Sequence, residues 1–201
     1  MKLAGEYTFD APVKTVWDAL LDPEVLAATL PGCDKLELID GVYEGALNIK
    51  VGPVQGKFKG KVALEELREL EGYTMVVDGK GAPGFVKARA DIALTQSGTE
   101  TKMSYDSDAR VGGRIASVGQ RLLEASAKAI VKQSLDGLNE IMKRRTAGIS
   151  DPAVIQAPSQ SEFARRVASE VTKELIPTPV RYGLVVAAMA AIAILVYSLA
   201  T

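Results

Sequence analysis

The chain has 201 residues, with 24 lysines and arginines against 25 aspartates and glutamates, and so a formal net charge of −1. This balance excludes a general nucleic-acid binder, which would carry a strong basic excess. Histidine is absent and Cys33 is the only cysteine, which excludes histidine-based catalytic pairs, imidazole metal ligands and an intrachain disulfide, so we expect neither a catalytic residue nor a metal site.

The first hundred or so residues read as one strand, two short helices and a run of strands. Residues 2–9 alternate between apolar and polar. Asp10 and Pro12 then predict the start of one helix, and Asp22-Pro23 the start of a second, which ends at Pro31-Gly32. Further strands are expected at about 34–39, 42–51, 54–67, 73–78, 85–95 and 101–111. Their short, turn-like connections favour an antiparallel meander.

A long helix is expected to follow the strands, from about residue 115 to residue 145. Its apolar side recurs at helical spacing, at Val118, Leu122, Leu135, Leu138 and Met142 among others. We therefore predict an α+β domain over residues 1–146, in which a curved antiparallel sheet wraps around this C-terminal helix.

Small residues interrupt the apolar faces of several predicted strands. In VQGKFKGKVAL, residues 54–64, the apolar face includes Gly56 and Gly60, which have no side chain to pack. Gaps of this kind predict an apolar cavity between sheet and helix. Bulges, strong coiling or close helix packing explain the same glycines, so both interpretations stay open at this point.

A linker is expected over residues 147–180. Its first part is rich in small residues and proline and reads as flexible. Residues from about 160 to 176 form a predicted amphipathic helix with a narrow apolar stripe. Both an interfacial helix lying on a membrane and a solvated linker helix fit this stripe.

Residues 181–201 read as a transmembrane anchor. Residues 183–200 carry no charge, and as a helix they would span about 27 Å, close to the hydrocarbon thickness of a bilayer. Basic residues precede the span and none follows it. The positive-inside rule therefore predicts a single-pass C-terminal anchor in the cell membrane, with the domain on the cytoplasmic side.

Three motifs resemble the family of the G subunit of carbon monoxide dehydrogenase: LPGC at 30–33, GAPGFVKA at 81–88 and VGGRIASVGQRLL at 111–123. The order of elements resembles the helix-grip fold of the superfamily that contains START domains and the birch pollen allergen. The resemblance implies an accessory protein that recruits a molybdenum-containing CO dehydrogenase, or a related hydroxylase, to the membrane. It also implies a quinone, with menaquinone as one candidate, as a non-covalent ligand in the cavity.

On this hypothesis a set of mostly apolar side chains, which would equally serve as ordinary core, forms the ligand cavity. They are Trp17, Leu26, Leu30, Gly56, Phe58, Gly60, Val62, Met75, Phe85, Val86, Tyr105, Ser107, Leu122 and Ile130. Tyr105 and Ser107 have hydroxyls that can bind a quinone oxygen or pair with backbone. Phe85 ends a glycine-rich connection and is either a mobile gate or part of an ordinary strand connection.

Two other functions are consistent with parts of the sequence. A docking adaptor or assembly factor for the same enzyme would have a filled core and no ligand. The row of Lys57, Lys59 and Lys61 is either a solvated face or a docking surface for anionic lipid or an acidic partner. An enzyme is not expected, because Asp91, Asp106, Asp108 and Arg110 alternate toward the outer side of their predicted strands.

Overall fold

The computed structural model describes residues 1–146, which build one sheet and the helices that lie on it. In chain order the elements are β1 (Lys2–Phe9), α1 (Val13–Leu21), α2 (Pro23–Thr29), β2 (Cys33–Ile39), β3 (Val42–Val51), β4 (Val54–Arg68), β5 (Gly72–Gly81), β6 (Gly84–Ser97), β7 (Glu100–Gly112), the 3₁₀ helix η1 (Arg114–Val118) and α3 (Gln120–Thr146).

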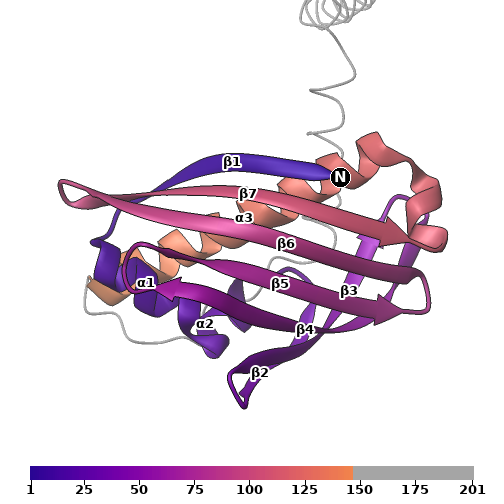
Figure 1. Cartoon of the computed structure of the whole chain (residues 1–201), viewed down its shortest axis with the longest axis horizontal. Helices are drawn as coiled ribbons and strands as arrows, with labels where there is room; N and C mark the ends of the chain where they lie inside the picture. Colours follow the sequence, from indigo (N-terminus) through magenta and orange to yellow (C-terminus); the bar gives the residue numbers. More distant parts are fainter. Residues whose placement is uncertain (147–201) are drawn as a thin grey trace, which may run out of the picture.

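The sheet has seven antiparallel strands in the order β1-β7-β6-β5-β4-β3-β2 (Figure 1). From β2 to β7 each strand pairs with the next one in the chain, so the predicted meander is confirmed. β1 instead pairs along its whole length with β7. The first strand of the chain therefore completes the sheet at the far edge from β2.

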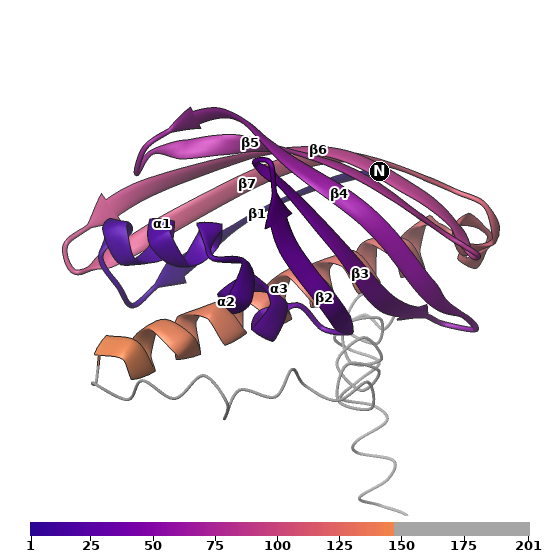
Figure 2. The same cartoon turned by 90° about the horizontal axis from the view of Figure 1, so that it is seen from below.

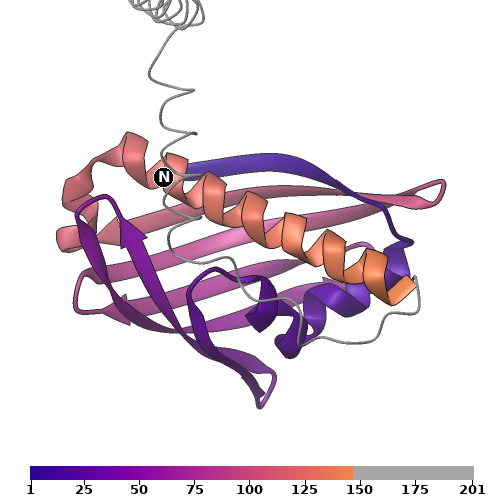
Figure 3. The ribbon, with the colours of Figure 1, turned by 180° about the vertical axis from the view of Figure 1, so that it is seen from behind.

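All the helices lie on one side of this sheet. Figure 2 shows the sheet arching over α3, and Figure 3 shows α3 crossing the concave face diagonally, with α1 and α2 on one side of it and β1 on the other. The prediction of a curved sheet around a long C-terminal helix is thus confirmed. No helix within residues 1–146 has an apolar stretch long enough to cross a bilayer. The predicted linker at 147–180, its amphipathic helix at 160–176 and the anchor at 181–201 lie outside the described residues.

Two helix starts differ from the predictions. α1 begins directly after Pro12 without a side-chain cap, and the carboxylate of Asp10 binds α3 instead. The long helix begins at Gln120 rather than near 115, because the preceding residues form η1. Gly113 and Gly119 flank η1 with φ values of 86° and 91°, a conformation that breaks an α-helix and suits glycine.

The start of α2 agrees with the prediction. Asp22 caps it by accepting hydrogen bonds from the backbone N–H groups of Glu24 at 2.9 Å and Val25 at 3.3 Å. The helix has Pro23 in its first turn. Capping and proline together position this short helix against α3, where Thr29 contacts Gly137.

The hairpin between β5 and β6 is tighter than expected. The glycine-rich stretch was predicted to connect the strands over several residues, but β5 extends to Gly81 and β6 begins at Gly84. Only Ala82 and Pro83 connect them. Pro83 is fully buried, which means that this turn folds inward and packs.

The apolar core between sheet and helices is divided into two main clusters. The larger cluster lies under α1 and the C-terminal half of α3 and contains Phe9, Trp17 and Met142. Trp17 packs edge-on against Tyr73, with ring centroids 5.9 Å apart. The smaller cluster lies near η1 and the start of α3 and contains Val51, Phe58 and Ile115. α3 spans both clusters, so it joins the two halves of the core.

A set of polar contacts holds α3 to the end of β1. The Asp10 backbone N–H donates to Asn139 Oδ1 at 3.0 Å, and Asn139 Nδ2 donates back to Asp10 Oδ2 at 2.9 Å. Lys143 Nζ lies 2.8 Å from the same carboxylate. One turn earlier, the Tyr7 hydroxyl donates to Asp136 at 3.0 Å. We call these contacts the β1–α3 clasp.

Candidate ligand-binding site

Two cross-strand rows on the concave face belong to neither main core cluster. One row consists of glycines: Gly45 pairs with Gly60, and Gly60 pairs with Gly79 on the next strand. The neighbouring row carries small and medium side chains, namely Val62, Val77, Ala88 and Ala109. On β4 the two rows are represented by Gly60 and Val62. The inward-facing residue that precedes them, Phe58, belongs to the smaller cluster, and the one that follows them, Leu64, packs on the larger cluster. The rows therefore mark a band where the core is interrupted.

The glycine row leaves room on the concave face of the sheet. A Cβ atom placed on Gly79 would have only two atoms within 4 Å, the backbone oxygens of Val86 at 3.8 Å and Lys59 at 4.0 Å. A Cβ on Gly60 would meet first the backbone of Asp78 and Gly79, at 3.1 Å and 3.2 Å. All of these atoms belong to the sheet. No atom of α3 is among the nearest neighbours of either glycine on its inward side.

One face of α3 runs from the smaller cluster to α2. Leu122, Ser126, Ile130, Gln133 and Gly137 recur at intervals of three or four residues and so share this face. Leu122 packs beside the turn between β3 and β4, at Gly52, and Gly137 packs on Thr29 of α2. The face thus runs from that turn to α2. We call the two sheet rows, together with Ser126, Ile130 and Gln133, the seam.

The two polar side chains of this helix face are buried without hydrogen-bond partners. Gln133 is 3% exposed and Ser126 is 1% exposed. In the described part of the chain, the buried side-chain atoms with no partner are Ser126 Oγ and both Nε2 and Oε1 of Gln133. Buried polar atoms are nearly always paired in proteins. An unpaired amide between two halves of an apolar core is a feature expected of a ligand site.

Many of the predicted cavity residues belong to the two core clusters or to the seam. Gly60, Val62 and Ile130 are part of it. Phe58, Val86 and Leu122 belong to the smaller cluster on one side. The residues on the other side, in or against the larger cluster, are Trp17, Leu26, Met75 and Tyr105. Leu30 is the half-buried cap residue at the end of α2.

The remaining predicted residues serve other purposes in the structure. A Cβ on Gly56 would come 2.5 Å from Pro83 Cγ, so Pro83 fills the space that the sequence suggested for a ligand. Phe85 alternates to the outer face of β6, is 40% exposed and lies across Gly112. The Ser107 hydroxyl donates to the Leu3 backbone oxygen at 2.9 Å, which is the backbone pairing considered above. The Tyr105 ring lies over Gly5.

Burial affects Tyr105, which packs against the larger cluster. Desolvation raises the pKa of the Tyr105 hydroxyl above its ordinary value, and the charge of Lys128 partly offsets this. The hydroxyl therefore stays protonated at neutral pH and is a neutral donor, not a phenolate. It lines a separate cleft of about 320 Å³ between β1, β7 and α3, together with Tyr7 and Leu135.

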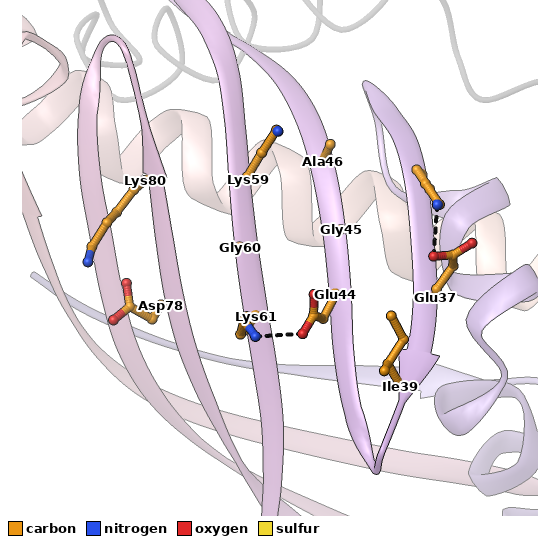
Figure 4. Close-up of a pocket in the computed structure, with 11 residues that line it drawn as sticks. Glu37, Ile39, Glu44, Gly45, Ala46, Lys59, Gly60, Lys61, Asp78 and Lys80 are labelled. Carbon is orange, nitrogen blue, oxygen red and sulfur yellow. Dashed lines mark hydrogen bonds and ion pairs between the residues drawn. The ribbon is translucent and has the colours of Figure 1, made fainter.

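A groove of about 590 Å³ lies on the opposite face of the sheet, away from α3 (Figure 4). It is lined by Lys35, Glu37, Ile39, Glu44, Gly45, Ala46, Lys59, Gly60, Lys61, Asp78 and Lys80. Two lysines of the predicted basic row are neutralised, since Lys57 lies 2.6 Å from Asp34 and Lys61 lies 2.6 Å from Glu44. Lys59 has no such partner within residues 1–146, and it stands directly opposite Lys80 on β5. Among the lysines of this groove, Lys59 and Lys80 are the two without a carboxylate partner within residues 1–146, since Lys35 pairs with Glu37 and Lys61 with Glu44.

The acidic and basic side chains considered for catalysis lie on the outer face of the sheet. Asp91, Asp106, Asp108 and Arg110 are exposed on β6 and β7, and Asp91 accepts a hydrogen bond from Thr74 at 2.7 Å. Over residues 1–146, no group of three or more histidine, cysteine, aspartate or glutamate side chains is placed to hold a metal ion. Burial raises the pKa of the Cys33 thiol, which disfavours its reactive thiolate form.

Comparison with known proteins gives one family match. The model of the CoxG family, described as the G subunit of carbon monoxide dehydrogenase, matches residues 5–142 of this chain. A crystal structure of a conserved protein from Geobacillus kaustophilus is similar over 72% of this chain and 96% of its own, with 31% sequence identity and a TM-score of 0.69. No curated protein sequence matches the chain.

More distant structures agree in fold. A START superfamily protein from Mycobacterium smegmatis has 12% identity and a TM-score of 0.56, with 72% of this chain and 98% of its own covered. The Zhui aromatase/cyclase from Streptomyces sp. R1128 has 15% identity and a TM-score of 0.53, with 73% and 95% covered. At these identities the likeness concerns the fold alone, and the helix-grip fold that the order of elements predicted is confirmed.

Proposed function

Since this chain belongs to the CoxG family, the G subunits of carbon monoxide dehydrogenase, we propose that it is an accessory protein of a molybdenum-containing CO dehydrogenase or a related hydroxylase. We also propose that it carries a respiratory quinone in the seam. The observation that carries the proposal is the glycine row beneath α3. A Cβ atom placed on Gly79 would have no neighbour closer than 3.8 Å, and this row belongs to neither of the two main apolar clusters.

An apolar site of this kind is sufficient to bind an isoprenoid quinone. Burying the tail contributes about 0.8 kcal/mol for each methylene group, so affinity requires no charged contact. Val62, Val77 and Ile130 supply apolar wall on both sides of the band. The side chains around the seam thus match the chemistry of the tail.

The proposal includes a link to the membrane. Residues 181–201 have the length and apolar character of a bilayer anchor, and the linker at 147–180 would keep the domain on the cytoplasmic side and close to the bilayer. A tether of this kind raises the effective concentration of domain, membrane quinone and enzyme with respect to one another. Electrons from the enzyme would then reach a quinone held near the membrane.

We infer a carrier role and not a catalytic one. Asp91, Asp106 and Asp108, the carboxylates considered for catalysis, are exposed on the outer face of β6 and β7, on the other side of the sheet from the seam. The side chains that we assign to the seam carry no ionisable group. Binding and positioning are therefore the activities that its chemistry supports.

The test is to fill the seam without disturbing the sheet. Gly79→Leu places a side chain where no close neighbour stands, so the protein should fold and lose at least about tenfold in quinone affinity. The full chain is inserted in phosphatidylcholine nanodiscs and titrated with a short-chain quinone, and binding is followed by quenching of Trp17, the only tryptophan. Lys80→Leu, the next residue on the outer face, is the matched control and should bind as the wild type does.

The docking adaptor makes the opposite prediction. If wild type and Gly79→Leu show the same non-saturable quenching, the quinone only partitions into the bilayer and the seam holds no ligand. Retention of dehydrogenase binding by that same preparation would then favour an adaptor or assembly factor. Saturable quenching in the wild type and its loss in Gly79→Leu support the carrier.

A further inference from the structure

We propose that Gln133 and Ser126 are the polar anchors of the seam and hydrogen-bond the oxygen atoms of the quinone head group in both its oxidised and its reduced form. This inference rests on the proposed function, and it names the residues that select the head group. Neither residue was singled out for this role by the sequence motifs.

The first argument is the cost of leaving these groups unpaired. An amide or hydroxyl buried without a partner destabilises the fold, and an apolar side chain at position 133 would avoid that penalty. Gln133 contributes an unpaired donor and an unpaired acceptor, and Ser126 contributes a hydroxyl. A ligand with its own donors or acceptors would satisfy them.

The second argument is that the neighbouring hydroxyls are already engaged. Ser134 donates to the Ile130 backbone oxygen at 2.9 Å, and Thr29 donates to the Leu26 backbone oxygen at 3.1 Å. Both residues pair within their own helix. Ser126 and Gln133 are thus distinguished from other polar residues around this helix face by their lack of a partner, and not by residue type alone.

The third argument is spacing. Ser126 and Gln133 are seven positions apart, which places their Cα atoms about 10.5 Å apart along α3 on the same face. Helical side chains lean toward the N-terminus, so the long Gln133 side chain leans toward Ser126 and narrows the distance between their polar atoms. Ile130 lies between them. The arrangement fits a flat ring that carries oxygen atoms on opposite edges and rests on an apolar side chain.

The fourth argument concerns the chemistry of the head group. A quinone presents carbonyl oxygens, which accept hydrogen bonds, and addition of two electrons and two protons converts them to hydroxyls, which also donate. An amide has both a donor and an acceptor, and a hydroxyl likewise acts as either. A buried lysine or aspartate would instead favour one form and carry a desolvation penalty. Gln133 and Ser126 can bind the ligand before and after its reduction.

The experiment compares an oxygenated ligand with a hydrocarbon of similar build. The full chain in phosphatidylcholine nanodiscs is titrated with a short-chain quinone and its quinol, and squalene, an isoprenoid without oxygen, is used as competitor. We expect Gln133→Leu to weaken both quinone and quinol roughly fivefold to tenfold, as expected for loss of a hydrogen bond, and to leave squalene competition unchanged. Ser126→Ala should give a smaller loss.

A second readout separates a ligand anchor from a structural residue. Because Gln133→Leu removes an unpaired buried amide, it should raise the thermal midpoint of the ligand-free protein, whereas loss of a structural hydrogen bond would lower it. Gln120→Leu, on the exposed first turn of the same helix, is the control for adding a leucine and should change neither binding nor this midpoint.

The outcomes distinguish this inference from the proposed function. If the wild type binds quinone saturably and Gln133→Leu binds it equally well, or if the variant lowers the ligand-free midpoint, the anchor assignment is overturned and the carrier proposal stands. If the wild type binds neither quinone nor squalene, the carrier proposal itself is overturned. Selective loss of quinone and quinol with a raised midpoint supports the anchors.

Discussion

Gly56 and Gly79 both face inward on neighbouring strands of the sheet, yet their surroundings differ. At Gly79 a Cβ atom would have no neighbour closer than 3.8 Å, whereas at Gly56 it would come 2.5 Å from the ring of Pro83. Gly56 is therefore small because the β5–β6 turn packs on it. Gly79 faces space that nothing in the sheet fills.

This difference gives a prediction for stability. Gly56→Ala should lower the free energy of unfolding by about 1–3 kcal/mol, because the rigid proline ring cannot move aside without shifting the turn. The double variant with Pro83→Ala should recover much of that loss. Urea unfolding of the four proteins measures the coupling. An additive result, with no recovery, would mean that Pro83 is not what restricts position 56.

At the level of single residues, the predicted cavity and the proposed seam overlap in part. Gly60, Val62 and Ile130 were expected in the cavity from alternation and helical spacing, and we include them in the proposed seam. Gly56 was misassigned, because only the folded turn shows that Pro83 reaches it. Gln133 was missed, although it lies at helical spacing from Leu122 and Ser126. A polar residue within an apolar stripe was the available signal.

Among the elements, α3 depends on the β1–α3 clasp for its position. Asn139→Ala removes both hydrogen bonds to Asp10 and should lower the free energy of unfolding at neutral pH by about 1–3 kcal/mol. Lys143 and then Asn139 hold the pKa of the Asp10 carboxyl below its ordinary value of 3.8. Because the pKa is lower in the folded state, the ionised Asp10 stabilises the fold at pH values above its ordinary pKa. This stabilisation is lost as the pH falls through the folded-state pKa.

The difference between wild type and Asn139→Ala should therefore narrow below about pH 4, as Asp10 becomes protonated in both proteins. It should not vanish, since the Asp10 backbone N–H still donates to Asn139 Oδ1 in the wild type. Urea unfolding across this pH range measures the gap, with Gln120→Leu as an exposed control on the same helix. A gap that stays constant with pH would show that the charge of the Asp10 carboxylate contributes nothing to its hydrogen bond with Asn139.

The elements themselves were largely predictable, because their signals are local. Alternation identified the strands, and Asp22-Pro23 identified the start of α2. The errors occurred where long-range packing decides the backbone. Gly113 and Gly119 adopt positive φ and separate η1 from α3, and the spacing of apolar residues through 114–118 is compatible with α- and 3₁₀-helix alike. Pairing with neighbouring strands extended β5 and β6 into the glycine-rich stretch.

For the molecule as a whole, two candidate binding surfaces lie back to back on the same strands. β4 carries Gly60 toward the seam and Lys59 toward the outer groove, and on β5 Gly79 faces the seam beside the outward-facing Lys80. Like charges directly opposite each other on neighbouring strands are unfavourable. An acidic surface docked on the groove would relieve that repulsion, and this makes the groove our candidate for enzyme binding.

We therefore expect the double variant Lys59→Glu and Lys80→Glu to weaken binding of the purified dehydrogenase about tenfold at low salt, with the difference shrinking as salt is added. Biolayer interferometry with the full chain at two ionic strengths measures this. Lys2→Glu with Lys102→Glu changes the net charge equally on β1 and β7 and should have little effect. Equal losses in both double variants would point to net charge and not to the groove.

The pairing of β1 with β7 has a consequence for how the protein is made. Ser107 bonds to the backbone of Leu3, 104 residues earlier in the chain, so β1 leaves the ribosome long before its partner strand exists. The hairpins from β2 to β7 can form as they emerge, but closure of the sheet has to wait for β7, and α3 docks later still. Contacts this distant in sequence slow folding. Until synthesis passes β7, the apolar face of β1 stays uncovered, and this nascent strand is the segment we expect chaperones to bind.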